Sequence, residues 1–354
     1  MKKRPPAHGR GAPGNPDNRF DAVTREPDSE CDPGDQAMPK TTFLHDTTKS
    51  FITYNDSPDL GMSAGINPYR GCEHGCVYCF ARPTHEYLGM SSGLDFESRI
   101  MVKHQAPVIL RKELASAKYR PQPLGLSGNT DPYQPAEQRF RLSRQCLAVL
   151  ADFRNPVGII TKNRLVVRDL DILKALNAFG CVKVYLSITT LDPQLANLME
   201  PRASTPADRL RAVRELSRAG IPVGVMLAPV IPGLTDEEIP AILEASAQAG
   251  AASARLIMVR LPYSVKDLFT AWLERHYPDR TSRILNRIKS VRNGRLNDPS
   301  FHNRLRGTGV HADQVHKIFT IYSKRYHLNR DSAPLTTAHF RKPSPQLMLF
   351  GDKL

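Results

Sequence analysis

The sequence of 354 residues predicts an α/β fold, built as an open partial barrel of six strand–helix units. Short apolar segments of strand length alternate strictly with longer segments that carry apolar residues at helical spacing. Such alternation is typical of a parallel sheet covered by helices. Six units are fewer than the eight that close a full TIM barrel, so we expect one side of the barrel to stay open.

The first three strands are expected at residues 64–68, 124–127 and 157–161, where short apolar runs occur. Pro107 begins the helix after the first strand, because proline is tolerated in the first turn. The helix after the second strand places apolar residues between Leu142 and Phe153 on one face. These segments give the first half of the barrel.

The second three strands are expected at residues 182–188, 223–229 and 254–259. Three glycines, at positions 180, 220 and 250, stand just before these strands and end the preceding helices. Thr205 and Pro206 mark the start of one of these helices. The strand–helix order is therefore kept through the second half of the barrel.

The segments outside the barrel differ from it in composition. Residues 1–40 are rich in Pro, Gly, Arg and Asp and lack apolar periodicity, which predicts a disordered arm. We expect the barrel core at 41–277, a basic helical extension at 278–330 that closes its open side, and a flexible tail at 331–354. Arginines between 280 and 306 either neutralise phosphates or form a solvated helix face.

Three of the six cysteines, Cys72, Cys76 and Cys79, lie within eight residues. Gly71 and Gly75 let the backbone turn sharply, so the three thiolates can face one centre. Clustered thiolates bind zinc or an iron–sulfur cluster. Because the stretch follows the first predicted strand, it lies at the carboxyl ends of the strands, where barrels of this kind carry their chemistry.

The ligand count favours the iron–sulfur cluster over zinc. A closed zinc site takes four protein ligands. No fourth cysteine lies nearby, and His74 sits between two of the cysteines rather than on a separate arm. Three ligands on a four-iron cube leave one iron open for chemistry. The alternative is a non-catalytic, zinc-stapled nucleic-acid-binding protein.

The other cysteines are interpreted as structural or idle. Cys146 belongs to the apolar stripe of a predicted helix, and Cys181 begins a strand at the end remote from the chemistry. Both are expected in the core, because free cysteine packs as a small apolar group. Cys31 falls in the predicted arm and is expected to be an idle thiol.

The spacing Cys72-x3-Cys76-x2-Cys79, with Tyr78 before the last cysteine, resembles the signature of radical S-adenosylmethionine (SAM) enzymes. Residues 66–71 and 80–82 resemble the branch related to spore photoproduct lyase, and the likeness runs from about 42 to 262. It implies a partial (β/α)6 barrel of the radical SAM type, with a 4Fe–4S cluster on the three cysteines and SAM at the open iron. Reductive cleavage of SAM then gives a 5′-deoxyadenosyl radical, which abstracts hydrogen from the substrate.

The resemblance also implies SAM contacts at the strand ends. Asn129 and Asp131 follow the second strand, where related enzymes hold the amino group. Lys162 ends the third strand, and Ser187 and Thr189 end the fourth, where the family contacts carboxylate and ribose. Short polar residues after strands also form turns, so a purely structural role stays open for Asn129 and Asp131. A lysine at a barrel mouth is less readily explained as solvated surface.

Two positions depart from spore photoproduct lyase. That enzyme carries, at the end of strand two, a cysteine that returns hydrogen to the substrate radical, and here Ser127 or Gly128 stands in its place. Phe80 replaces a second tyrosine beside the cluster. The resemblance therefore implies the superfamily but not thymine-dimer reversal by that hydrogen-return route.

The formal net charge of +14 and a pI near 9.6 predict an acidic partner, with nucleic acid first. We therefore expect DNA repair or lyase-like activity, with a radical reaction on a protein or small molecule as the alternative. A reductant such as flavodoxin or ferredoxin must supply the electron. The cysteine pattern and the lack of an apolar leader or membrane span predict a cytoplasmic protein.

The stretch from Gln346 to Phe350, Gln-Leu-Met-Leu-Phe, resembles the short motif by which bacterial repair and replication proteins dock onto the DNA sliding clamp. Its apolar residues suit a pocket on a partner protein, and the glutamine supplies a polar contact that fixes the orientation of the bound segment. The alternative is that this tail folds back over a groove on its own domain.

Overall fold

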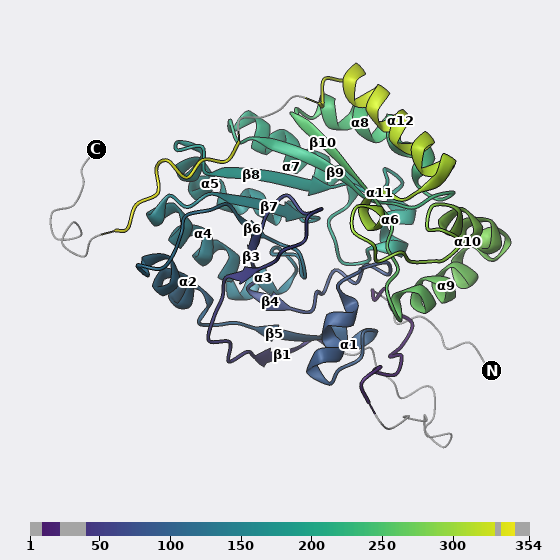
Figure 1. The fold of residues 1–354 in the computed structure, drawn as a ribbon, viewed down its shortest axis with the longest axis horizontal. Coiled ribbons are helices and arrows are strands. Elements are labelled where there is room, and N and C mark those ends of the chain that lie inside the picture. Colours follow the sequence, from purple (N-terminus) through teal and green to yellow (C-terminus); the bar gives the residue numbers. More distant parts are fainter. Residues whose placement is uncertain (1–8, 22–39, 330–333, 344–354) are drawn as a thin grey trace.

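In the computed structural model, residues 9–21, 40–329 and 334–343 are described, and a seven-stranded sheet forms their centre (Figure 1). Its order is β10-β9-β8-β7-β6-β3-β2, with six parallel strands and β2 antiparallel to β3 at one edge. The strands are β2 Thr53–Tyr54, β3 Ala64–Ile66, β6 Leu124–Leu126, β7 Val157–Thr161, β8 Val182–Ser187, β9 Val223–Val230 and β10 Ser253–Met258. The predicted six parallel strands are confirmed.

Helices cover the outer face of this sheet (Figure 1). Helix α2 packs on α4, α4 on α5, and α7 on α8. Their apolar stripes meet the strands in one large hydrophobic core, which contains Cys146 and Cys181 as predicted. The bounds are α2 Ala106–Ala115, α3 Ala136–Phe140, α4 Leu142–Phe153, α5 Leu170–Asn177, α6 Pro193–Met199, α7 Pro206–Arg218 and α8 Ile239–Gln248.

A second, three-stranded sheet lies beside the barrel. Strand β5 (Arg99–Val102) runs between β1 (Thr42–His45), to which it is parallel, and β4 (Tyr69–Arg70), to which it is antiparallel. Helix α1 (Leu94–Ser98) leads directly into β5. This sheet was not expected from the sequence, because its strands are short and mix exposed with buried positions.

Residues 9–21 correct the expectation of a fully disordered arm. The backbone N–H groups of Gly11 and Ala12 donate to the carboxylate of Glu97, at 3.0 and 2.8 Å. Asn18 donates to the carbonyl of Glu86 at 2.9 Å. These contacts fix the segment against the body of the protein without any apolar periodicity of its own. Cys31 lies outside the described residues.

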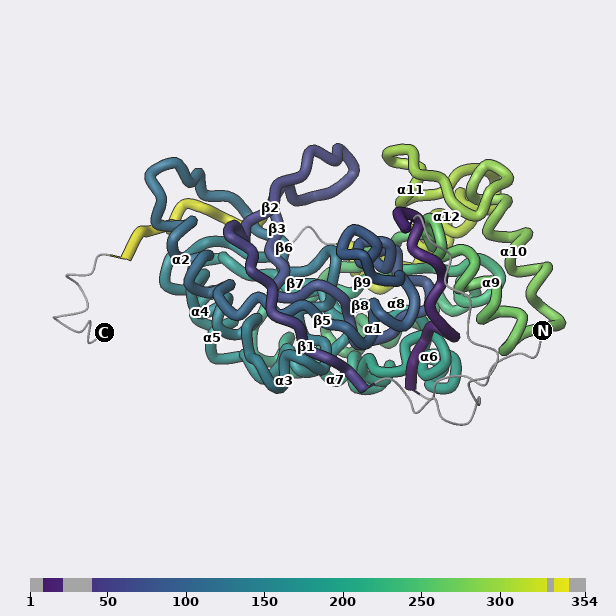
Figure 2. Tube along the Cα trace, turned by 90° about the horizontal axis from the view of Figure 1, so that it is seen from below, coloured from purple at the N-terminus to yellow at the C-terminus, as the bar shows by residue number. Residues whose placement is uncertain are grey.

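Helix α9 Val265–His276 ends the predicted core, and the basic extension that follows contains α10 Thr281–Ser290, α11 Asn303–Arg306 and α12 Gly309–Arg325. Helix α11 packs on β10, and α12 packs on β10 and α8, so both lie at one edge of the large sheet. The loop between β2 and β3 reaches them from the other edge, where Asp59 accepts from Arg304 Nε at 2.8 Å and Nη2 at 2.5 Å. Both regions lie at the top of the view in Figure 2. This ion pair joins the two edges across the open side.

Residues 334–343 pack at the opposite end of the barrel. The ring of Phe340 lies 5.8 Å from that of Tyr119 and 6.2 Å from that of Phe153, and Thr336 N–H donates to the carbonyl of Gly180. These contacted residues precede β6, β7 and β8, so the segment crosses the amino ends of the strands. Gln346–Phe350 lies outside the described residues. None of the described helices is long and apolar enough to cross a membrane.

Candidate functional site

The cysteine-rich loop follows β4 and precedes a 3-10 helix at Arg82–Leu88. Its glycines have φ values of +81° at Gly71 and +69° at Gly75, which confirms that the loop needs glycine at both turns. Cys72 and Cys76 are buried, and Cys79 is half-buried. The loop thus holds two thiols inside and one at its margin.

The three thiols lie close enough to affect one another electrostatically. Burial raises the pKa of the Cys72 thiol well above its usual value, and Asp131, Cys76 and Cys79 raise it further. Burial and Glu200 also raise the pKa of Cys76. Buried thiolates with such neighbours need positive charge beside them. An iron–sulfur cluster supplies that charge, so the donor set fits this group.

The same side chains do not form a compact site for one ion. Within residues 9–21, 40–329 and 334–343, no three Cys, His, Asp or Glu side chains converge so that they can hold a single metal ion. In a four-iron cluster, by contrast, each of the three thiolates binds a separate iron.

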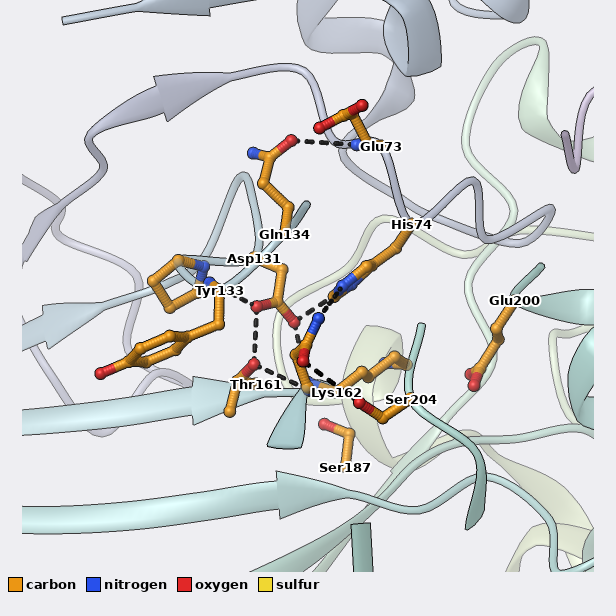
Figure 3. A network of polar contacts seen from close by, with 12 residues as sticks. Glu73, His74, Asp131, Tyr133, Gln134, Thr161, Lys162, Ser187, Glu200 and Ser204 are labelled. Atoms are coloured by element: carbon orange, nitrogen blue, oxygen red, sulfur yellow. Dashed lines mark hydrogen bonds and ion pairs between the residues drawn. The ribbon is translucent and has the colours of Figure 1, made fainter. Parts of the chain in front are cut away.

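Asp131 connects the cysteine loop to the end of β7 (Figure 3). Its carboxylate accepts from Thr161 Oγ1 at 2.6 Å and from the backbone N–H of Lys162 at 2.8 Å. His74 Nδ1 lies 3.4 Å from the same group. Burial alone would raise the pKa of Asp131, but His74 and these hydrogen bonds lower it to about 2. Asp131 is therefore an ionised anchor, with both oxygens already engaged by the protein.

His74 itself is held on both sides. Asn163 Nδ2 lies 3.2 Å from His74 Nε2. The Asn163 side-chain oxygen accepts from Leu165 N–H and Ser204 Oγ, which fixes the amide orientation. Nε2 is then the acceptor and Nδ1 carries the proton that faces Asp131. Although His74 lies between two predicted ligands in the sequence, its ring contacts Asp131 and Asn163, and these contacts hold the loop in place.

Two buried side chains hold the backbone of the loop. Gln134 accepts from Glu73 N–H at 3.0 Å (Figure 3). It also donates to the carbonyl of Gly71 at 3.0 Å, so it holds the backbone on both sides of Cys72. Arg82 donates to the carbonyls of Gly75 and Cys76 at 3.2 and 2.9 Å. Its guanidinium is fully buried and paired with Glu97 at 2.5 Å.

Glu200 forms a second buried network beside the loop. Its carboxylate accepts from the hydroxyl of Tyr78 and from Thr189 Oγ1, and it is paired with Arg209. Burial raises the pKa of Glu200, while Arg209 opposes this shift. The structure thus brings Tyr78 and Thr189 together, but through Glu200, which sequence reasoning did not identify.

The remaining predicted SAM contacts differ in exposure. Lys162 is half-buried at the barrel mouth, where its Nζ donates to the carbonyl of Ala228 at 3.3 Å and lies 5.8 Å from the centre of the Tyr78 ring. Ser187 is buried at the end of β8, and its carbonyl accepts from Arg209. Asn129 is exposed in the turn after β6. Lys162 and Ser187 therefore lie near the cysteine loop, with Asn129 at the rim.

Sequence reasoning missed Gln134, Glu200, Arg209 and the roles of Arg82 and His74. Gln134 lies 61 residues from the loop position it contacts, and Glu200 lies 122 residues from Tyr78. No local pattern encodes such distant pairs. The only signal in the sequence was that Arg82 and Glu97 are ionisable residues. The structure shows that both side chains are fully buried as an ion pair.

Comparison with known proteins identifies the family. The model of the Radical SAM superfamily matches residues 66–245, about half of the chain. The chain is also 38% identical over 243 residues to an uncharacterized protein of Mycobacterium tuberculosis, covering 68% of this chain and 71% of that protein. The chain belongs to the radical SAM superfamily. A 4Fe–4S cluster and SAM are thus the cofactors of this radical SAM enzyme.

Other similar proteins agree with this assignment. An uncharacterized protein of Methanocaldococcus jannaschii is 31% identical over 178 residues, covering 50% of this chain and 64% of that protein. A spore photoproduct lyase mutant with bound AdoMet and dinucleoside spore photoproduct has a TM-score of 0.59. It shares 18% identity and covers 80% of this chain and 78% of its own. This similarity shows that the radical SAM enzyme has the fold of that lyase.

Proposed function

We propose that the enzyme holds its 4Fe–4S cluster on Cys72, Cys76 and Cys79 and acts on nucleic acid in a DNA repair or lyase-like reaction. One observation supports the cluster assignment: the loop that carries the three cysteines is held by buried hydrogen bonds to its backbone, at the carboxyl ends of the six parallel strands. When bound, the reduced cluster supplies the electron that splits SAM and yields a 5′-deoxyadenosyl radical.

The side chains at the mouth divide into two proposed roles. Lys162 carries a positive charge near Tyr78, suited to a charge-assisted hydrogen bond with the SAM carboxylate. Ser187 is proposed to contact the ribose of SAM, and the exposed Asn129 is proposed to contact its amino group. Asp131 and Thr189 are already engaged by His74 and Glu200, so we assign them to positioning the cysteine loop. Tyr78, tied to Glu200, is proposed to pack against the cofactors.

Two findings support nucleic acid as the substrate. The chain carries a net charge of +14, which favours a polyanionic partner. Its fold is similar to that of spore photoproduct lyase, whose structures include one complexed with dinucleoside spore photoproduct. Ser127 and Gly128 occupy the strand end where that enzyme carries its hydrogen-returning cysteine, so we propose a different outcome for the substrate radical here. A flavodoxin or ferredoxin in the cytoplasm is the proposed electron donor.

We also propose that Gln346–Phe350 docks on a DNA sliding clamp. Residues 334–343, which precede the motif, are held at the barrel end opposite the cysteine loop, with Lys342 Nζ donating to the carbonyl of Ser116 at 2.8 Å. A clamp bound beyond this segment would leave the mouth free for substrate. A peptide of residues 344–354 should bind a purified clamp, and changing Leu349 and Phe350 to Ala should remove that binding.

The substrate proposal is tested by label transfer. Anaerobically reconstituted enzyme is incubated with SAM, a reductant and deuterated oligonucleotides, with and without ultraviolet lesions. We expect deuterium in 5′-deoxyadenosine from at least one oligonucleotide. SAM cleavage that proceeds without label from any of them would overturn nucleic acid as the substrate while leaving the superfamily assignment intact.

A further inference from the structure

One aromatic side chain lies exposed directly beside the predicted cluster ligands. Phe80 follows Cys79, and 45% of its surface is exposed, whereas Tyr78 on the other side of Cys79 is only 5% exposed. A phenylalanine exposed to this extent forgoes part of the free energy that burial would provide. A flat, solvent-facing ring at a barrel mouth is a surface on which a nucleobase can stack.

Arg260 lies over one face of this ring. Its guanidinium carbon lies 4.2 Å from the centre of the Phe80 ring. The side chain is half-buried, just after the carboxyl end of β10. Across the described parts of the chain, Arg260 makes no hydrogen bond or ion pair with another residue. Burial and the nearby Arg304 lower the pKa of Arg260, while Asp59 and Cys79 act in the opposite direction.

The neighbouring arginines differ from Arg260 in this respect. Arg304 is paired with Asp59, and its guanidinium lies 4.7 Å from the exposed ring of Phe301. Arg292 is fully buried and donates to the backbone carbonyls of Met258, Val259 and Asn303. Arg292 thus fixes the backbone beside Arg260. Of this group, Arg260 is the one that makes no hydrogen bond or ion pair with another described residue, although Asp59 lies near enough to affect its pKa.

We propose that Phe80 and Arg260 form a nucleotide-binding contact at the rim of the cluster site, in which Phe80 stacks on an unpaired base and Arg260 binds the adjacent phosphate. The inference rests on the proposed nucleic-acid substrate and deepens it, because it names the groups that recognise the strand. Arginine suits both tasks, since it stacks on an aromatic face while its N–H groups bind phosphate oxygens. Phe301 and Arg304 extend the same surface by one further aromatic–arginine pair.

The test measures binding of a fluorescent single-stranded DNA of about 12 nucleotides, at several salt concentrations, to the cluster-loaded full chain. Arg260→Gln should weaken binding and reduce the slope of log affinity against log salt by about 0.7, the value for one lost phosphate contact on a single strand. Phe80→Leu should weaken binding by roughly 5- to 150-fold with little change in slope. Arg260→Lys should restore the slope.

Matched controls remove the same groups elsewhere. Arg255→Gln removes one positive charge from an exposed position of β10, the strand that Arg260 follows. Tyr54→Leu removes an aromatic ring that is 65% exposed. Both should bind DNA as the wild type does. Iron content and thermal unfolding confirm that each variant is folded and loaded.

The outcomes separate this inference from the proposed function. If the wild type binds DNA and Arg260→Gln behaves like Arg255→Gln, the nucleotide contact is overturned and the nucleic-acid substrate stands. If the wild type binds no DNA at all, both are overturned. The contact is supported if Arg260→Gln weakens binding and is the only variant that reduces the salt slope.

Discussion

The two sides of the cysteine loop differ in how completely their polar groups are paired. Behind the loop, Arg82 donates to four backbone carbonyls and to Glu97, and Gln134 uses both ends of its amide. At the rim, Phe80 and Asn129 are exposed, and Arg260 is half-buried. The buried side holds a fixed geometry, whereas the rim keeps groups available for ligands.

The contrast has a physical cause. A buried charge is tolerated only when it is paired and hydrogen-bonded, so the residues behind the loop admit a single arrangement. A group at the rim remains solvated, and a ligand can replace that water. Substitutions on the two sides are therefore expected to have different consequences.

Loss of a predicted ligand should have the largest effect. Replacing Cys72, Cys76 or Cys79 by Ala should abolish SAM cleavage and reduce iron content, because each thiolate binds a separate iron. Cys146→Ala and Cys181→Ala are the controls, since both thiols are buried in the core. Iron lost from either control in folded protein would disprove the three-ligand assignment.

Breaking the buried ion pair behind the loop should come next. Arg82→Met leaves Glu97 buried without its partner, which costs about 3–5 kcal/mol of folding free energy. Arg99→Met breaks a nearby ion pair in which Arg99 is exposed and Asp95 is largely buried, and should cost about 0–1 kcal/mol because the arginine is solvated. Denaturant unfolding measures both. Equal effects would show that the loop is not held from behind.

The N-terminal segment offers a finer test of the same side. A side chain at Gly11 would place its Cβ only 1.7 Å from the carbonyl oxygen of Gly75, whereas one at Gly14 meets nothing within 4 Å. Gly11→Val should therefore cost about 1–3 kcal/mol at this contact and speed iron loss to a chelator. Gly14→Val should lose iron at the wild-type rate. Matching rates for the two variants would mean that residues 9–21 do not support the cluster loop.

Lys162 tests the cofactor side of the mouth. Lys162→Ala should weaken SAM binding by roughly 10- to 150-fold, as expected for a charge-assisted hydrogen bond of about 1.5–3 kcal/mol. Iron content should not change, because Lys162 is not among the predicted ligands. Lys174→Ala, at an exposed position of α5, is the control. Unchanged SAM affinity in Lys162→Ala would remove it from the proposed site.

The ion pair across the open side should have the smallest effect. A hydrogen bond from Arg304 lowers the pKa of Asp59 to about 2, so its stabilising contribution is present above the unfolded pKa of about 3.9 and is lost only as pH falls toward 2. Asp59→Asn should thus cost about 1 kcal/mol or less, by the same amount from pH 5 to 8. Unfolding free energies that diverge within this range would contradict the assignment.

The barrel was predictable because its strands are continuous apolar runs buried on both faces, as at β6 and β7. Strands β1 and β4 were not, since two to four residues with mixed exposure carry no period. The order of residues 9–21 depends on Glu97, 86 residues beyond Gly11. Such order comes from tertiary hydrogen bonds that composition does not encode.

The candidate site divides in the same way. Spacing alone identified Cys72, Cys76 and Cys79, because the ligands of one cluster lie on one short loop. The groups that hold that loop, such as Gln134 and Glu200, come from other strand ends. For Asp131 and Thr189 the sequence located the strand end but not the partner, and the partner determines the role.

Metal, sulfide and electron paramagnetic resonance analysis of anaerobically purified enzyme decides between an iron–sulfur cluster and a zinc site on the cysteine loop. A four-iron cluster with one open iron predicts about four irons and four acid-labile sulfides per chain, and a signal of the reduced cluster that changes when SAM is added. Colourless protein with one zinc per chain and no sulfide would contradict the assignment of a four-iron cluster to the cysteine loop.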